Sequence, residues 1–415
     1  MSHVLGLRCV LCGAEYAQDQ AAYVCPEHGD AGILDVVYDY PAVARVLTRE
    51  ALAARAEPSL WRYRELLPVQ RLDLAPPLQI GWTPLYRAHR LGASLGLEHL
   101  WVKDDGRNPT ASFKDRASAI AVVRAQEAKQ HTVTAASTGN AASSLAGLSA
   151  GVGLRTVIFV PERAPRAKVA QLLLYGATVL MVRGTYDQAF DLCLRASARY
   201  GWYSRNTAYN PYLSEGKKTA VLEICEQLRW RPTDRLYVAV GDGCIIGGLG
   251  KGLRDLLALG LIERAPRLIG VQAEGSSALA AAWAQGGEEV APVAAETVAD
   301  SISVGKPRDA IKALRAVRET NGAFVTVSDQ EILEAMRLLA RETGVFAEPA
   351  GATPLAGLRR DLREGRVHPG ERIVLLVTGH GLKDVDSALR AAAAEPVLLE
   401  PDERALQRAV RSLGL

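Results

Sequence analysis

Lys114 stands just after Pro109, which interrupts regular structure, and just before an alanine-rich stretch that predicts a helix. The positive end of a helix dipole lowers the pKa of a nearby amine. A neutral amine can attack a carbonyl group and hold it as an imine. Residues 109–116 therefore place a potential nucleophile at a helix start, although by itself an exposed lysine is the simpler interpretation.

Two clusters of small residues follow predicted strands and could bind anions. Ser137-Thr138-Gly139-Asn140 precedes further small residues, so helix N–H groups and two hydroxyls could receive a carboxylate or phosphate. Gly241-Asp242-Gly243-Cys244-Ile245 precedes a leucine-rich helix, a setting in which glycines let the backbone wrap a phosphate. It is not a Walker loop, and Ile246 replaces the third glycine of a dinucleotide motif. A capped helix start and a tight turn explain the two clusters about equally well.

Three of the six cysteines lie near the N-terminus with a histidine, at spacings typical of zinc ligands. A glycine follows each ligand pair, as the tight turns of a zinc ribbon require. Four ligands would close the tetrahedron, so the zinc ion would be structural. Because a histidine replaces the fourth cysteine, a metal-free remnant held by packing is the alternative. The predicted ligands are Cys9, Cys12, Cys25 and His28.

Short apolar runs alternate with helical patterns over most of the chain. Parallel strands need helical crossovers, so this alternation predicts an α/β fold with a mostly parallel sheet. Ligands of such sheets bind at the carboxyl ends of strands, where the chain carries the clusters at 135–140, 240–243 and 377–381. The predicted strands are Leu100–Lys103, Thr132–Ala135, Thr156–Val160, Thr178–Val182, Leu236–Val240, Leu268–Gln272 and Ile373–Val377.

The chain has 415 residues and a formal net charge of +3. Two packed domains with an appendage suit this length. So small a net charge argues against a nucleic-acid partner. The longest uncharged run, 132–154, is rich in Gly, Ser and Thr, so no membrane span is expected, and the N-terminus lacks the pattern of a secretion signal. We therefore expect a cytoplasmic protein.

Taken together and in order, these motifs resemble those of fold-type II pyridoxal-phosphate (PLP) enzymes, which have the tryptophan synthase β-like fold. Within this family the threonine synthases are the most similar branch, because the segment 378–384 and the N-terminal ribbon both resemble theirs. The resemblance implies an α/β fold with two open, mostly parallel sheets, helices on both faces and a zinc-ribbon-like N-terminal extension. The other similar segments are 109–116 (the lysine motif), 137–140 (the loop for the substrate carboxylate), 241–245 (the phosphate cup), and the signatures 81–85 and 348–351.

The resemblance also assigns roles to individual residues. Lys114 would hold PLP as a Schiff base and act as the base at the substrate's Cα and Cβ. Thr378 would offer the pyridine nitrogen a hydroxyl instead of a carboxylate, which suits elimination and replacement over transamination. Asn140 would bind the cofactor's phenolic oxygen, and only the N–H of Asp242 would help to hold the phosphate. The predicted cofactor-binding residues are Lys114, Phe113, Asn140, Gly241, Asp242, Gly243, Cys244, Ile245 and Thr378.

The implied substrate is a small, phosphorylated amino acid. Threonine synthases usually carry an arginine for the substrate phosphate where this chain has Leu213. Lys217, Lys218 or Arg205 could replace it, but a lysine does not reproduce the two-pronged contact of an arginine. The predicted substrate-binding residues are Ser137, Thr138, Gly139, Asn210, Lys217 and Lys218.

The implied reaction converts O-phospho-L-homoserine and water to L-threonine and phosphate, by γ-elimination and addition at Cβ, in a homodimer. Because Leu213 weakens the phosphate site, β-elimination or β-replacement on serine, threonine or O-phosphoserine is an alternative, as in ammonia-lyases or cysteate synthase-like relatives. A non-catalytic regulatory protein on the same fold is a further alternative, which the retained Lys114 disfavours.

Motif order and composition also predict domain limits. They are an N-terminal extension with the ribbon at 1–75, helical over 41–75; a large domain that binds the cofactor phosphate at 76–98 and 211–390; a small domain with the carboxylate loop and the lysine region at 99–210; and a C-terminal helical tail at 391–415.

Overall fold

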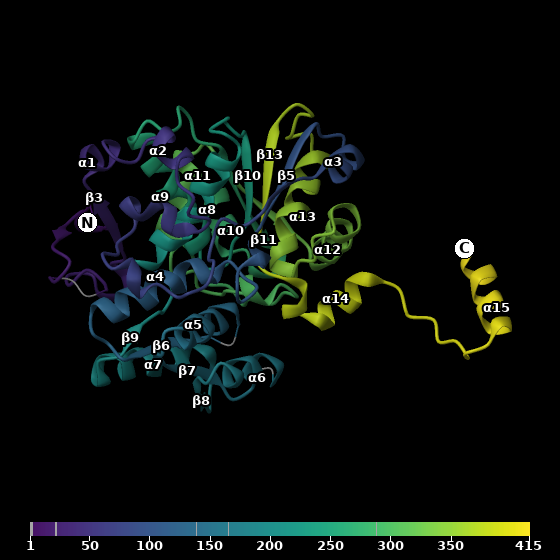
Figure 1. The fold of residues 1–415 in the computed structure, drawn as a ribbon, viewed down its shortest axis with the longest axis horizontal. Helices are drawn as coiled ribbons and strands as arrows, with labels where there is room; N and C mark the ends of the chain where they lie inside the picture. The colour runs from purple at the N-terminus through teal and green to yellow at the C-terminus, as the bar shows by residue number, and fades with distance from the viewer. Residues whose placement is uncertain (1–2, 21–22, 138, 165, 288) are drawn as a thin grey trace.

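Two main sheets organise the chain, and the larger lies above the smaller in the view of Figure 1. The structure is a computed structural model that describes residues 3–20, 23–137, 139–164, 166–287 and 289–415. The larger sheet is parallel except at its β4 edge. Its strands, in spatial order, are β12 (Ala323–Val327), β11 (Arg267–Ala273), β10 (Arg235–Ala239), β13 (Arg372–Val377), β5 (His99–Asp104) and β4 (Leu85–Arg87).

Helices cover both faces of the larger sheet. Successive strand side chains point to opposite faces, so Leu236 and Val238 pack with one helical layer while Tyr237 packs with the other. The first layer contains α8 (Leu213–Gln227), α9 (Cys244–Ala258), α10 (Ala278–Ala284) and α11 (Ala310–Glu319), and the second α3 (His89–Leu95), α12 (Asp329–Thr343), α13 (Pro349–Arg363) and α14 (Val385–Ala392).

The smaller sheet has four parallel strands, and its two faces belong to different hydrophobic clusters. Ile158 packs towards α4 and α5, whereas Phe159 packs against α7. In spatial order the strands are β8 (Thr178–Val182), β7 (Arg155–Pro161), β6 (Thr132–Ala136) and β9 (Tyr203–Ser204); the helices are α4 (Lys114–Glu127), α5 (Asn140–Ala150), α6 (Arg166–Leu174) and α7 (Tyr186–Tyr200).

The predicted α/β fold with two mostly parallel sheets is confirmed, and each of the seven predicted strands is present. One strand lies in a different sheet from the one expected. The predicted limit at residue 99 assigns β5 to the smaller domain, but β5 pairs with β13 in the larger sheet. Alternation of strands and helices shows that a strand exists and does not show which sheet it joins.

The N-terminal extension begins with a small antiparallel sheet of β1 (Val4–Cys9), β2 (Glu15–Tyr16) and β3 (Leu34–Tyr38). The expectation of a helical stretch over 41–75 is largely wrong. The chain forms only α1 (Tyr40–Ala44), α2 (Arg49–Ala53) and the 3-10 turns Leu60–Leu66 and Leu72–Leu74. Pro58 and Pro68 interrupt the pattern, because proline cannot donate the backbone hydrogen bond of a helix interior.

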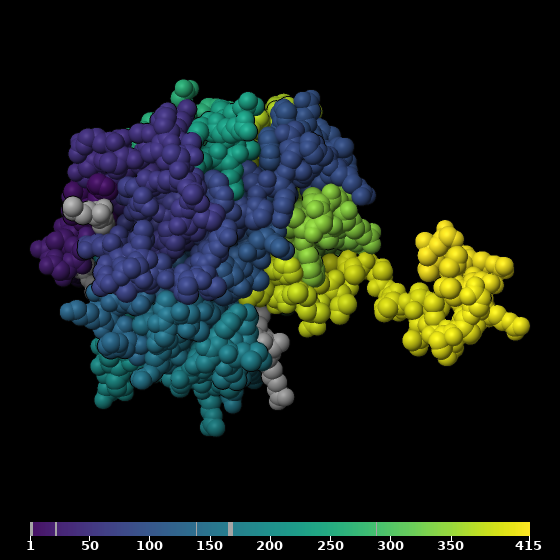
Figure 2. Space-filling model, in the orientation of Figure 1, coloured from purple at the N-terminus to yellow at the C-terminus, as the bar shows by residue number. Residues whose placement is uncertain are grey.

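The C-terminal tail stands off the rest of the chain. Figures 1 and 2 show α15 (Glu403–Leu413) joined to α14 by an extended segment, apart from both sheets. Of the predicted helical tail 391–415, the helix is thus confined to the end. Within the described ranges, no helix is both long and apolar enough to cross a membrane.

A fully buried ion cluster joins the larger sheet to α4 and α8. Arg116 of α4 donates from Nε to Asp105, which follows β5 (2.6 Å), and from Nη1 to Glu223 of α8 (2.5 Å). Lys103 of β5 donates to the same Glu223 (2.6 Å). Although burial raises the pKa of Glu223, the charges of Arg116 and Lys103 outweigh it and lower that pKa to about 2. The cluster therefore holds Glu223 ionised and fixes both helices on the sheet.

Replacing Arg116 with Met should lower the free energy of unfolding by about 3–5 kcal/mol, because Asp105 would stay buried without its cationic partner and Glu223 would keep only Lys103. Denaturant titration of the purified variant measures this loss. The matched control is Arg71→Met, which breaks a pair with Asp73 whose side chains are 62% and 61% exposed. That change should cost less than about 1 kcal/mol. Equal effects of the two substitutions would contradict the account.

Candidate active site

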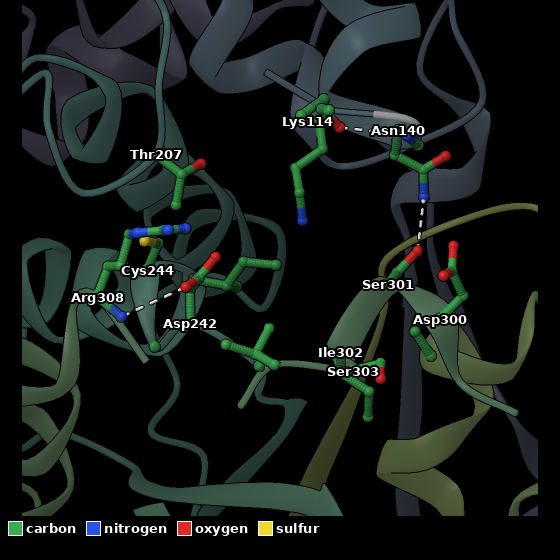
Figure 3. Close-up of a pocket in the computed structure, with 18 of the residues that line it drawn as sticks. Lys114, Asn140, Thr207, Asp242, Cys244, Asp300, Ser301, Ile302, Ser303 and Arg308 are labelled. Carbon is green, nitrogen blue, oxygen red and sulfur yellow. Dashed lines mark hydrogen bonds between the residues drawn. The ribbon is translucent and has the colours of Figure 1, made fainter. Parts of the chain in front are cut away.

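A cavity of about 650 Å³ opens where strands of both sheets end. Residues that follow β6, β10 and β13 line it, as expected for ligands of parallel sheets. The structure thus brings the three predicted clusters to one place, and Figure 3 labels members of two of them, Asn140 and Asp242. The predicted residues in its wall are Lys114, Ser137, Gly139, Asn140, Lys217, Gly241, Asp242, Gly243, Cys244, Ile245 and Thr378.

Backbone hydrogen bonds position the lysine segment against the loop that follows β13. The N–H of Phe113 donates to the carbonyl of Thr378 (2.9 Å), and the N–H of His380 donates to the carbonyl of Ala111 (3.1 Å). Lys114 then begins α4 and its side chain extends into the cavity (Figure 3). The two predicted cofactor contacts, at Lys114 and Thr378, therefore lie in adjoining segments.

The pKa of Lys114 is lowered to about 8, chiefly by burial and further by the charges of Lys217 and Arg205. The position of Lys114 at a helix start predicted a lowered pKa. The structure adds two causes, burial and the cationic neighbours, that no sequence pattern identified. Near neutral pH an appreciable fraction of the Lys114 amine is therefore neutral and nucleophilic.

The glycine-rich loop after β10 leads directly into the first turn of α9. Gly243 has φ of 90°, and a Cβ there would lie 2.8 Å from the Cβ of Ala313 and 2.9 Å from the carbonyl oxygen of Asp309. Only glycine fits this turn. The first N–H groups of α9 have no intrahelical acceptor, so they can bind an anion. The carboxylate of Asp242 accepts the N–H of Arg308 (3.3 Å; Figure 3), which leaves the loop backbone to the ligand.

Asn140 is held by groups from the larger domain. Its Nδ2 donates to Oε1 of Glu348 (2.8 Å) and to Oγ of Ser301 (3.3 Å; Figure 3). Burial raises the pKa of Glu348, and the hydrogen bond from Asn140 opposes that rise. For Asn140 to bind the cofactor's phenolic oxygen, its amide would exchange one of these two partners.

Two buried cations, Arg205 and Lys217, face the cavity without a carboxylate partner within salt-bridge distance in the described structure. Arg205 donates from Nε to Ser118 (3.1 Å) and from Nη1 to Thr207 (3.4 Å), while its buried Nη2 has no hydrogen-bond partner among described residues. Burial lowers the pKa of Arg205 to about 10 and also lowers that of Lys217. Burying unpaired cations is unfavourable, so this arrangement favours an anionic ligand.

The structure does not place every predicted residue in the cavity wall. Lys218 is buried on the other side of α8, where Glu215 and Asp255 accept from its ammonium. Asn210 uses its side chain within its own loop, with the carbonyl of Ser204 (2.8 Å) and the N–H of Tyr212 (3.1 Å). Both are therefore corrected from substrate ligands to structural residues. Phe113 is fully buried and is not among the described lining residues, and Thr138 lies outside the described residues.

The segment 292–306, which has no sequence motif, forms one side of the cavity and carries Ser301. Arg308 and Tyr186 were also not predicted. Both line the cavity, and the guanidinium of Arg308 lies over the ring of Tyr186. These residues follow no strand in a recognisable motif, so only the tertiary fold brings them in. Glu348 lies in the segment 348–351, which resembles a family signature, so the sequence could have indicated that Glu348 lies in the site.

The N-terminal cluster is a candidate metal centre. The ligand atoms of its four residues all lie within 4.8 Å of one another, a spacing that suits zinc with bonds of about 2.0–2.3 Å. Each ligand pair ends in a tight turn, with the N–H of Gly13 donating to Cys9 (3.0 Å) and that of Gly29 to Cys25 (2.9 Å). The predicted ribbon geometry is therefore present at Cys9, Cys12, Cys25 and His28.

Comparison with known proteins identifies the family. The family described as pyridoxal-phosphate dependent enzyme matches residues 77–379. The chain is 40% identical to the threonine synthase of Methanocaldococcus jannaschii, over 98% of this chain and 99% of the relative. It is 39% identical to the threonine synthase of Methanosarcina acetivorans, over 97% and 98%. This chain belongs to the threonine synthase family of PLP-dependent enzymes.

Solved structures of other PLP enzymes share the fold of this family member. Threonine deaminase isoform 2 from Solanum lycopersicum matches with a TM-score of 0.66 at 22% identity, covering 81% of this chain and 94% of that chain. Diaminopropionate ammonia lyase from Escherichia coli matches with a TM-score of 0.65 at 20% identity, covering 82% and 93%. At these identities the likeness concerns the fold alone, and it confirms the predicted fold type.

The residues of this family member fit PLP. A glycine cup at a helix start suits the cofactor's phosphate, and Lys114 reaches the same cavity with an amine that is partly neutral. Thr378 presents a hydroxyl at the end of β13. A volume of about 650 Å³ accommodates a cofactor together with a small amino acid.

The rate at which cofactor-free enzyme captures PLP should rise with pH through about 8, because only the neutral Lys114 amine reacts. Below that pKa the amine is protonated, and above it the rate should level off. Stopped-flow absorbance across this range measures the profile. Reduction with borohydride should then fix the cofactor on Lys114, and Lys114→Ala should prevent labelling. A rate that keeps rising up to the ordinary lysine pKa of 10.5 would contradict the account.

Proposed function

We propose that this protein is a PLP-dependent threonine synthase that converts O-phospho-L-homoserine and water to L-threonine and phosphate. The observation that carries the proposal is the pair of cations, Arg205 and Lys217, in a cavity that also contains the glycine cup and Lys114. One phosphate belongs to the cofactor. Two buried cations can balance more charge than this one phosphate carries, and the phosphate of the proposed substrate supplies the second anion.

Arg205 would bind the substrate phosphate in place of the arginine that threonine synthases usually carry at the position of Leu213. Leu213 is 1% exposed and packs in the apolar core, so it has no access to ligand. Arg205 lines the cavity, and Ser118 and Thr207 hold two of its nitrogens, which fixes the direction of the guanidinium. A guanidinium held in this way loses little side-chain entropy on binding a phosphate. Lys217 adds a second charge to the same wall.

The residues around the cavity divide the work of catalysis. When bound, PLP supplies an electron sink for the substrate's Cα. The Nζ of Lys114 takes protons from Cα and then Cβ. Ser137 and the backbone of Gly139 hold the α-carboxylate, and Arg205 and Lys217 hold the phosphate while the Cγ–O bond breaks. Protons return to Cγ and then to Cα, and water adds its hydroxyl group to Cβ, so that L-threonine and phosphate are the products.

One observation favours the alternative reaction, which is β-elimination or β-replacement on serine, threonine or O-phosphoserine. Leu213 is apolar where an arginine was expected, so the phosphate site differs from the usual one. Lys114 and the glycine cup serve both reactions equally. A substrate comparison separates them.

With PLP-loaded enzyme, O-phosphohomoserine should release phosphate and L-threonine in equal amounts. Serine, threonine and O-phosphoserine should release little ammonia or phosphate by comparison. Arg205→Met should raise KM for O-phosphohomoserine about 10- to 100-fold, the effect of losing a hydrogen bond to a charged group. The matched control, Arg155→Met, changes an exposed arginine of the same domain and should leave KM unchanged. Ammonia from serine without phosphate from O-phosphohomoserine would establish the alternative.

We further propose that the N-terminal cluster binds one structural zinc ion and that the protein is a cytoplasmic homodimer. Native mass spectrometry of freshly purified protein measures both composition and assembly. The expected mass is that of two chains with two zinc ions. Cys12→Ser should lose the metal, whereas Cys193→Ser, which changes a buried thiol elsewhere, should retain it. A metal-free wild-type chain would overturn the zinc proposal, and a monomer would overturn the dimer.

A further inference from the structure

Tyr23 connects the N-terminal ribbon to the smaller domain. It lies two residues before Cys25, and its hydroxyl accepts the backbone N–H of Ser204 (3.1 Å). Its ring packs on Tyr209 (5.1 Å between centroids) and edge-on against Tyr203 (5.9 Å).

The segment that Tyr23 contacts carries part of the cavity wall. Arg205 directly follows Ser204, and Thr207 lies two residues further on. On its inner side this loop is anchored to β6, because the N–H of Arg205 donates to Thr134 (2.8 Å) and the side chain of Asn206 accepts from Ala136 (2.9 Å). Tyr23 supplies an outer anchor on the opposite side of the same backbone.

The loop needs such an anchor because its backbone is strained. Ala208 has φ of 57°, a left-handed conformation that a residue with a Cβ rarely adopts. It stands between Thr207, which accepts from Arg205, and Tyr209, on which the Tyr23 ring packs. Without contacts that hold both ends, this turn would relax and shift the side chains beside it.

We propose that Tyr23 is a positioning residue for the substrate's phosphate, holding the loop 204–209 so that Arg205 and Thr207 face the cavity. The inference rests on the proposed function for the identity of the anion. It gives the ribbon a role in substrate affinity, although none of its four candidate metal ligands is among the described residues that line the cavity. Tyr23 touches neither substrate nor cofactor, so it acts through Arg205 and its effect should appear in KM.

Two variants separate the parts of this contact. Tyr23→Phe removes only the hydroxyl and should raise KM for O-phosphohomoserine about fivefold, the usual effect of one hydrogen bond. Tyr23→Ala also removes the ring and should raise KM, and the inhibition constant of inorganic phosphate, by about tenfold or more. In both, kcat should change by less than about twofold. Zinc content and PLP absorbance, measured alongside, should match the wild type.

The matched control is Tyr40→Phe. Tyr40 lies in the same extension, and its hydroxyl donates to Asp255 of α9 (2.6 Å), away from the loop. This variant loses a comparable hydrogen bond between the extension and the body, and its KM should stay at the wild-type value. Equal rises in KM for Tyr40→Phe and Tyr23→Phe would show a general structural effect and overturn the proposal.

Hydrogen exchange provides a readout that does not depend on turnover. Amides of residues 203–209 should exchange faster in Tyr23→Ala than in the wild type, in cofactor-free as well as loaded enzyme. If Tyr23→Ala does not fold, Tyr23→Phe decides through KM. If the wild type does not turn over O-phosphohomoserine, the proposed function fails, and exchange at 203–209 together with binding of inorganic phosphate still tests Tyr23. Unchanged exchange and unchanged phosphate affinity would overturn it.

Discussion

The buried cluster around Arg116 is the constraint on which the site depends. It ties the larger sheet, the helix that begins at Lys114 and the helix that carries Lys217 to one set of charges with no access to water. The two helices meet so closely that a Cβ at Gly216 would lie 2.0 Å from the carbonyl oxygen of Arg116. The positions of the reactive amine and of its cationic neighbour are therefore set by the same packing.

The charges in the cavity differ from those in this cluster, because the buried cations of the cavity have no carboxylate partner in the described chain. Lys217 and Lys218 are neighbours on α8, but a rotation of about 100° per residue points their side chains in different directions. Lys218 meets Glu215 and Asp255, whereas Lys217 meets the cavity with no carboxylate within salt-bridge distance in the described chain. Together with Arg205 it lowers the pKa of Lys114. The site is thus prepared for anionic ligands and for a neutral amine by the same unpaired charges.

Sequence reasoning reached the fold because long parallel strands leave strong apolar runs. It reached Lys114, Thr378 and the glycine loop because these positions follow strands directly, where ligands bind. It missed β12, whose edge position leaves it only partly buried, and the segment 292–306, which has no local pattern. It could not separate Lys217 from Lys218, because the direction of a side chain on a helix buried all round has no signature in hydrophobic period. Only the tertiary structure therefore shows which of these residues can contact the substrate.

The measurement that tests the account most directly is a crystal structure of PLP-loaded enzyme with a phosphonate analogue of O-phosphohomoserine. The account predicts the cofactor phosphate on the backbone of 241–245, the Nζ of Lys114 facing the ligand's Cα, and the phosphonate within hydrogen-bond distance of Arg205 and Lys217. A phosphonate that lies away from both cations, or a cofactor held by another lysine, would contradict it.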